Sequence, residues 1–102
     1  MITAFQHTIY EALKKVPKGR VTTYKELAHA VHSKAYRAVG SAMRKNPFAP
    51  MVPCHRVINA DGSVGNFSGK GGVKGKIAFL RKEGICVIQS KIDLKKYMFR
   101  FK

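Results

Sequence analysis

The chain has 102 residues, 45% of them hydrophobic, which predicts one globular domain and excludes a disordered or fibrous protein. Its 20 lysines and arginines against 5 acidic residues give a formal net charge of +15, and a polyanion such as nucleic acid is the expected partner. A ribosome or an anionic membrane surface would attract the same charge. No apolar run approaches ~18 residues, which excludes a spanning helix, and two cysteines without a visible export signal favour a reducing cytosol.

Three helices are predicted in the first half of the chain. Apolar residues recur at helical spacing over residues 5–16, and Pro17 stops that helix. Thr23 and Glu26 have the spacing of a capping box, which opens the second helix. A short break at 32–34 precedes the third helix. The apolar face of the third helix is Ala35, Ala38, Val39, Ala42 and Met43.

The other face of the third helix suggests contact with a phosphate backbone. Arg37 and Arg44 flank two very small residues, Gly40 and Ser41, so a backbone can come close to the helix. Two short helices joined by a tight break, with such a face on the second, form a helix-turn-helix. The alternative is a solvated basic face on an ordinary core helix.

The second half predicts fewer regular elements. Residues 57–65 indicate a β-hairpin with an Asp-Gly turn, and residues 68–72 form a glycine-rich loop without the spacing of a nucleotide-binding loop. A last helix ends at Gly84. The tail from about 89 to 102 alternates basic and apolar residues and is predicted as a strand, a docking segment or a DNA-contacting arm. The fold class is therefore mainly α, with a winged helix-turn-helix-like core of three helices, a short β-hairpin wing and an additional C-terminal helix.

A cysteine beside a histidine lies in an apolar segment, residues 51–58, that has the pattern of a buried strand edge. The thiolate is the nucleophilic form of cysteine, and an imidazole next to it indicates a base at hand. On a strand Cys54 and His55 would point to opposite faces, so a bridging water or a turn would be needed for the imidazole to reach the thiol. Cys54 as a small buried hydrophobe is the plain alternative. A zinc site is disfavoured because the ligand spacings are missing, and Cys86, in an apolar run, is predicted to be core.

The string PCHRV (residues 53–57), preceded by 37–47 and followed by 65–69, closely resembles the O6-alkylguanine-DNA alkyltransferases, the methylated-DNA–protein-cysteine methyltransferases. The resemblance runs from about residue 5 to residue 84, with several motifs in the right order. It implies a DNA repair protein that flips O6-alkylguanine out of duplex DNA and transfers the alkyl group irreversibly to its own Cys54. Such a protein is a single-turnover methyltransferase, and neither a cofactor nor a metal is expected.

The same resemblance implies roles for individual residues. His55 would deprotonate Cys54 through a water, and Glu83 would hold and polarise His55. Tyr24 would donate a hydrogen bond to N3 of the guanine and offset charge on the leaving base. Arg37 would enter the base stack from the minor groove and fill the space of the flipped base. The DNA-binding set is Arg37, Gly40, Ser41, Arg44 and Lys45.

The substrate pocket is implied in the same way. Asn46 would brace the turn before the reactive segment, and the carbonyls of Cys54 and Val57 would accept from the guanine amino group. Phe67, where the family often has tyrosine, would form a ring wall, and the Ser68 amide would donate to O6.

The implied partner is double-stranded DNA containing O6-alkylguanine, bound through its minor groove by a monomer and not at a membrane. The expected place is the cytoplasm with the nucleoid, or the nucleus of a eukaryote. Family members usually carry an additional N-terminal domain. The resemblance implies that this chain, residues 1–102, is their C-terminal reactive domain without that N-terminal domain, and the role of its tail from about 89 to 102 is left open.

Three other functions compete with alkyl transfer. The alkyltransferase-like proteins share the scaffold but replace the cysteine, and they would bind damage without repairing it. Cys54 argues for transfer. A winged-helix transcription or nucleoid factor would leave PCHRV without a purpose, and a cysteine hydrolase would leave the arginine-bearing helix-turn-helix unexplained.

Overall fold

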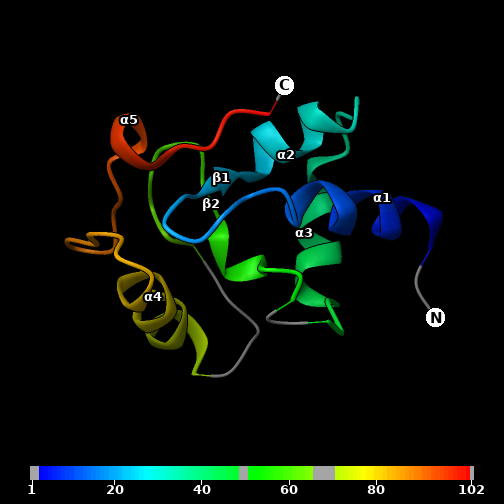
Figure 1. Ribbon diagram of the computed structural model, residues 1–102. Helices are drawn as coiled ribbons and strands as arrows, with labels where there is room; N and C mark the ends of the chain where they lie inside the picture. Colours follow the sequence, from blue (N-terminus) through cyan, green and yellow to red (C-terminus); the bar gives the residue numbers. More distant parts are fainter. Residues whose placement is uncertain (1–2, 49–50, 66–70, 102) are drawn as a thin grey trace.

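The computed structural model describes residues 3–48, 51–65 and 71–101. Figure 1 shows α1, α2 and α3 grouped on one side of the molecule and α4 on the other, with β1 and β2 between them. The predicted mainly α fold with a winged helix-turn-helix-like core is confirmed. The elements are α1 (Ala4–Leu13), β1 (Thr22–Thr23), α2 (Tyr24–Ala30), α3 (Tyr36–Arg44), the 3-10 helix η1 (Cys54–Arg56), β2 (Val57–Ile58), α4 (Gly72–Lys82) and α5 (Leu94–Tyr97).

The first helix begins at a capping box that the sequence analysis did not predict. The Gln6 amide donates to the Thr3 hydroxyl, and the Thr3 amide donates to the Gln6 side chain. The helix buries Ile9, Tyr10 and Leu13. It ends at Leu13, before the predicted residue 16, and the chain leaves it in a turn. The Tyr10 hydroxyl donates to the Ala42 carbonyl at 2.8 Å, which fixes α1 against α3.

The helix-turn-helix forms as predicted, with small differences at its ends. The Thr23 hydroxyl accepts from the Glu26 amide at 3.0 Å and caps α2. The Glu26 carboxylate, expected to complete the capping box, lies 3.5 Å from the Arg100 guanidinium. The break covers residues 31–35 and turns at His32, which has a positive φ of 57°. Beyond it, α3 packs on the core through Val39, Ala42 and Met43.

The predicted hairpin over 57–65 has its turn but different strand partners. The Asn59 amide donates to the Ser63 carbonyl at 3.0 Å. A Cβ on Gly62, whose φ is +91°, would meet the Ile92 carbonyl oxygen at 2.8 Å, so only glycine fits this turn. Strand β2 pairs in parallel with β1, and Ser63 forms an antiparallel bridge with Lys91. Because Val57 and Ile58 are both fully buried, β2 needs cover on both faces, which a lone hairpin cannot supply.

The end of the chain docks on the domain. The Val21 amide donates to the Tyr97 carbonyl, and the Phe99 amide donates to the Val21 carbonyl. The rings of Phe99 and Phe101 pack against the core cluster of α1, α2 and α3. Of the three possibilities left open for the tail, the structure therefore favours a docking segment.

Cys86 is exposed, so its prediction as a core residue is wrong. Its neighbours Ile85 and Val87 are buried. The segment is extended, and its side chains alternate between inside and outside, so a continuous apolar run does not mean that every residue is covered.

Candidate active site and nucleic-acid interface

Cys54 lies at the start of a tight turn and not on a strand. It is the first residue of η1 and only 8% exposed, and the strand begins only at Val57. The predicted strand edge at Cys54 is therefore wrong, and the turn considered as the alternative is present. Pro53 has no N–H to offer a strand ladder, and the Val52 carbonyl accepts from the Asn46 side-chain amide at 2.7 Å.

The end of α4 brings a carboxylate to this turn. Glu83 Oε2 lies 3.1 Å from His55 Nε2, although the two residues are 28 positions apart. The same carboxylate accepts two bonds from Arg56, at 2.9 Å from Nε and 2.6 Å from Nη2. A third Arg56 nitrogen donates to the Val16 carbonyl. Sequence analysis paired His55 with Glu83 but missed Arg56. An arginine inside a buried apolar segment was the available signal, because such a charge needs an acidic partner.

Burial keeps His55 neutral, so that it can act as a base. Burial lowers the pKa of His55, and the charges of Arg56 and Lys76 lower it further, although Glu83 acts in the opposite direction. Burial alone would raise the pKa of Glu83, but its bonds from Arg56 and His55 hold it below its ordinary value. At neutral pH the Glu83 carboxylate is therefore ionised and can only accept hydrogen bonds, so the imidazole carries its proton on Nε2. Because its pKa is lowered, the imidazole is neutral at this pH. Nδ1 is left to take a proton.

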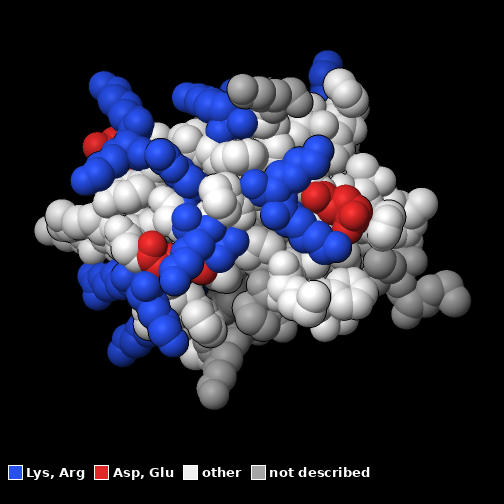
Figure 2. Space-filling view, viewed as in Figure 1, with Lys and Arg blue, Asp and Glu red and all other residues white. Residues whose placement is uncertain are grey.

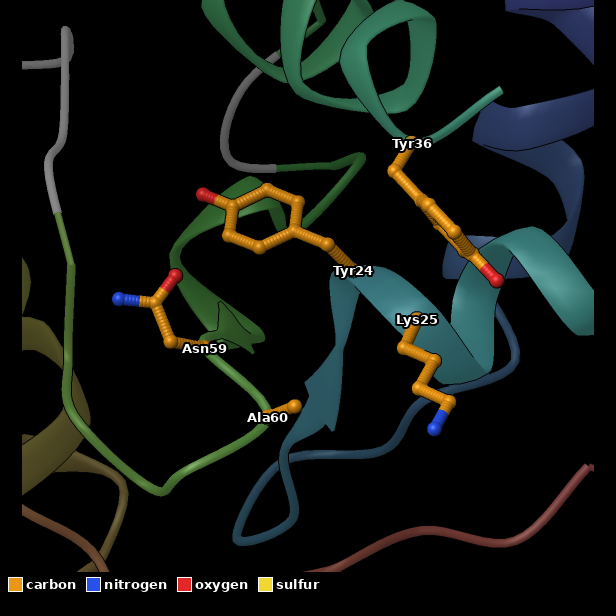
Figure 3. A pocket seen from close by; sticks show the side chains of 5 residues that line it. All are labelled: Tyr24, Lys25, Tyr36, Asn59 and Ala60. Atoms are coloured by element: carbon orange, nitrogen blue, oxygen red, sulfur yellow. The ribbon is translucent and has the colours of Figure 1, made fainter. Parts of the chain in front are cut away.

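Tyr24 presents a protonated hydroxyl near Cys54. Burial raises the pKa of Tyr24, and a negative charge on Cys54 raises it further, against a smaller effect of Arg44. The ring borders a pocket of about 430 Å³, shown in Figure 3, whose other lining residues come from the starts of α2 and α3 and the segment after β2. These residues are Lys25, Tyr36, Asn59 and Ala60.

The predicted DNA-binding face of α3 lies away from the core. Arg37, Arg44 and Lys45 are exposed, and Gly40 and Ser41 between them are half-buried. A methyl group on Gly40 would meet nothing closer than Arg44 Nη1 at 3.8 Å. Packing inside the protein therefore does not require glycine there, so its small size is available to an approaching partner. Figure 2 shows lysine and arginine side chains spread over this view of the molecule, with few acidic groups among them.

The structure describes only some of the residues predicted for the substrate pocket. Asn46 braces the segment before Cys54 through the bond to Val52, and its side-chain oxygen accepts from the Phe48 amide at 3.0 Å. The Val57 carbonyl accepts from Lys76 at 2.7 Å. Phe67 and Ser68 lie outside the described residues. Lys76 was missed by sequence analysis, where its position on a basic helix gave no sign that it is buried.

Neither a metal centre nor a membrane segment is found in the described ranges. Residues 3–48, 51–65 and 71–101 hold no group of three or more His, Cys, Asp or Glu that could bind a metal ion. Within the same ranges no helix has the length and apolar character needed to cross a membrane.

Comparison with known protein families identifies the scaffold. Residues 4–85 match the family described as 6-O-methylguanine DNA methyltransferase, DNA binding domain. The chain belongs to this family. Its match covers both the helix-turn-helix and the turn that carries Cys54, so the two features belong to one structural unit of the family.

Curated relatives of this methyltransferase family are longer than the chain. The bifunctional methyltransferase/endonuclease of Picrophilus torridus is 42% identical over 92 residues, which are 89% of this chain and 30% of that protein. The methylated-DNA–protein-cysteine methyltransferase of Rattus norvegicus is 47% identical over 81 residues, 78% of this chain and 38% of that protein. The chain thus spans well under two thirds of either relative.

Two solved structures of the family share the fold. S. pombe Atl1, in complex with damaged DNA containing O6-carboxymethylguanine, has a TM-score of 0.86 at 31% identity over 99% of this chain and 100% of that chain. Mycobacterium tuberculosis OGT, in complex with DNA, has a TM-score of 0.77 at 40% identity. That match covers 82% of this chain and 51% of the other.

Proposed function

We propose that this chain is the reactive domain of an O6-alkylguanine-DNA alkyltransferase, which moves an alkyl group from damaged guanine in duplex DNA to Cys54. The observation that carries the proposal is the surrounding of Cys54, a buried cysteine on a turn. The next residue, His55, is oriented as a base by the ionised Glu83, whose Oε2 lies 3.1 Å from His55 Nε2. Relatives named as methylated-DNA–protein-cysteine methyltransferases support it. The related Mycobacterium tuberculosis OGT structure, in complex with DNA, supports duplex DNA as the partner.

The proposed chemistry is a single displacement. His55 Nδ1 takes the thiol proton, through a water, and the Cys54 thiolate attacks the sp3 carbon attached to O6. The S–C bond forms as the C–O bond breaks, and the electron pair goes to the guanine. Tyr24 donates to N3 of the base and so stabilises the charge that develops there. The proton taken by His55 returns to the guanine, and the thioether on Cys54 ends the reaction after one turnover.

The helix-turn-helix would bring the lesion to this turn. In the proposal Arg44 and Lys45 contact phosphates, Arg37 fills the space left in the stack, and a monomer works from the minor groove. Tyr24 stands at the first position of α2, and a negative charge on Cys54 acts on its hydroxyl. Tyr24 would therefore link the DNA-reading motif to the reactive turn.

The decisive experiment is to incubate the protein with a duplex containing O6-methylguanine and to locate the added methyl group by peptide mass spectrometry. We expect one methyl group, on Cys54. The Cys54→Ser variant should gain none yet bind the duplex nearly as well, because phosphate contacts supply most of the affinity. Cys86→Ser is the matched control and should be methylated like the wild type. Methylation of any residue other than Cys54 would refute the mechanism.

Binding should fall steeply with salt, and reversing one charge on α3 should show where the phosphates lie. We expect Arg44→Glu to weaken binding and to make the plot of log K against log salt shallower, by roughly 0.9 for each phosphate that the variant no longer neutralises. The measurement is fluorescence anisotropy of a labelled duplex over a salt series. Lys82→Glu makes the same change of charge at the end of α4 and should leave the slope closer to that of the wild type. Equal slopes for the two variants would contradict an interface on α3.

A damage-binding role without transfer is the second candidate. The match to Atl1 over nearly the full length of both chains favours it, whereas Cys54 favours transfer. The methyl-mapping experiment separates the two, because a pure binding protein would retain the methylated duplex and gain no mass.

A further inference from the structure

The last residues of the chain give β1 a second partner. We call residues 97–101 the docked segment, and Figure 1 shows it in red, running from α5 toward α2. The Val21 amide donates to the Tyr97 carbonyl at 2.9 Å, and the Phe99 amide donates to the Val21 carbonyl at 2.8 Å. The next residue, Thr22, pairs with β2 instead. Successive residues of a strand direct their backbone bonds to opposite edges, so the docked segment and β2 lie on opposite edges of β1.

The side chains of the docked segment reach both hydrophobic clusters of the molecule. Tyr97 is buried in the cluster that also contains Leu80 of α4, and its hydroxyl accepts from the Cys86 amide at 3.2 Å. Phe99 and Phe101 pack on the other cluster, which includes residues of α1, α2, α3 and the reactive turn. The docked segment therefore runs from the side of α4 to the side of the helix-turn-helix.

The docked segment also contacts the first turn of α2. Arg100 Nη1 lies 3.5 Å from Glu26 Oε1, and Glu26 comes two residues after Tyr24, where α2 begins. The Arg100 side chain is 72% exposed, so this pair adds little stability by itself. Together with the bonds to Val21, however, it holds the chain on both sides of Tyr24.

The position of Tyr24 matters for the proposed chemistry. Its hydroxyl must meet N3 of the extruded guanine, and a misplacement of about 1 Å can cost roughly 100-fold in rate. Helix α3, with the proposed phosphate contacts, has a separate anchor, because the Tyr10 hydroxyl donates to the Ala42 carbonyl at 2.8 Å. A loosened docked segment should therefore disturb the reaction of the bound lesion more than the binding of the duplex.

We propose that the docked segment is a positioning element for the damaged base: by holding β1 and the first turn of α2, it keeps the Tyr24 hydroxyl where the extruded guanine arrives. The role of Tyr24 in this proposal rests on the proposed function. The docked segment itself lies beyond residues 4–85, the part of the chain that matches the family, so its role does not follow from that match.

The first test compares Phe99→Ala with Ile88→Ala. Phe99 is half-buried, whereas Ile88, which also follows α4, is 66% exposed. In Phe99→Ala we expect the single-turnover rate on a saturating duplex with O6-methylguanine to fall about tenfold, and the Kd for that duplex to change less than about twofold. Ile88→Ala should match the wild type. Phe99→Leu, which restores most of the packing, should recover most of the rate.

A second substitution separates positioning from a general loss of stability. Tyr24→Phe removes the hydroxyl that the docked segment is proposed to place. The effect of Phe99→Ala should nearly disappear in the Tyr24→Phe background, because the effects of coupled residues do not add. A fall of the same size in both backgrounds, or a wild-type rate in folded Phe99→Ala, would overturn the proposal.

Arg100→Glu decides if Phe99→Ala does not fold. It replaces an attraction to Glu26 by a repulsion on the surface and should slow transfer by up to about fivefold. Addition of Glu26→Arg should restore the rate, because the pair is then complete with its charges exchanged. An unchanged rate in Arg100→Glu, or no restoration by the exchange, would overturn the proposal.

A measurement without transfer distinguishes this proposal from the proposed function. With ¹³C-labelled tyrosine, NMR follows the Tyr24 ring of the free protein, and Tyr24→Phe identifies its signals. Phe99→Ala should shift these signals, whereas Phe99→Leu and Ile88→Ala should leave them near their wild-type positions. Shifted signals in a chain that accepts no methyl group would support the placement of Tyr24 while refuting alkyl transfer. Unshifted signals in folded Phe99→Ala would overturn this proposal even if Cys54 is methylated.

Discussion

Replacement of His55 by alanine or of Glu83 by glutamine is expected to slow alkyl transfer by about 100-fold or more, the usual contribution of a positioned base. The double variant should be little slower than the worse single variant, because the two residues act as a unit. Without Glu83 the imidazole loses the bond that fixes its proton on Nε2, and without His55 the glutamate has nothing to orient. The measurement is the single-turnover rate on a duplex containing O6-methylguanine, with circular dichroism to confirm that each variant is folded.

The lowered pKa of His55 determines the direction in which the transfer rate should change with pH. His55 must be neutral to take a proton, and burial lowers its pKa, so the wild-type rate should hold as the pH falls to the ordinary histidine value and decline only below it. At alkaline pH hydroxide can replace the missing base, and the single variants should recover part of their rate. Losses that simply add, or no alkaline recovery in folded protein, would remove the relay from the mechanism.

Replacement of Arg56 by methionine is expected to destabilise the fold by about 3 kcal/mol, because it leaves a largely buried carboxylate without its main partner. Arg56 and Glu83 are 16% and 13% exposed and share two short bonds. The loss of Arg56 also frees the Val16 carbonyl, to which a third nitrogen donates. Urea denaturation at neutral pH measures the change in the free energy of unfolding.

Arg81→Met is the matched control for Arg56→Met. Arg81 is exposed and donates one bond to the Val87 carbonyl at 2.8 Å, so its loss should cost roughly 1 kcal/mol or less. Adding Glu83→Gln to Arg56→Met should recover part of the stability, because the unpaired charge then disappears. If Arg56→Met is no more harmful than Arg81→Met, the buried pair does not hold α4 to the reactive turn.

The parts of the fold that depend on local pattern could be predicted from the sequence. Helical spacing and the Thr23 cap predicted α2 and α3 with bounds close to the observed ones, and the small residues on α3 indicated its outer face. Strand pairing was not predictable in the same way, because β2 joins β1 across 35 positions of the sequence. An Asp-Gly turn indicates a local hairpin but contains no information about such a distant partner.

The residues of the candidate site could be predicted where they belong to a recognisable family motif. The pairing of His55 with Glu83 came from the resemblance to a family, since nothing in the spacing of the two residues brings them together. Lys76 was missed because a lysine on a basic helix gives no sign of burial, whereas Arg56 was missed although its place in an apolar segment was a signal. Only the packing of α4 on η1 reveals both charges.

The junction between β1 and α2 limits how the chain can change in length. Thr23 pairs with Ile58, caps α2 and is followed at once by Tyr24. One residue inserted between Thr23 and Tyr24 would turn the tyrosine by about 100° around the helix axis. It would then occupy the exposed position that Lys25 now holds. Homologous chains should therefore vary in length in the break at 31–35 but keep the step from β1 to α2 constant.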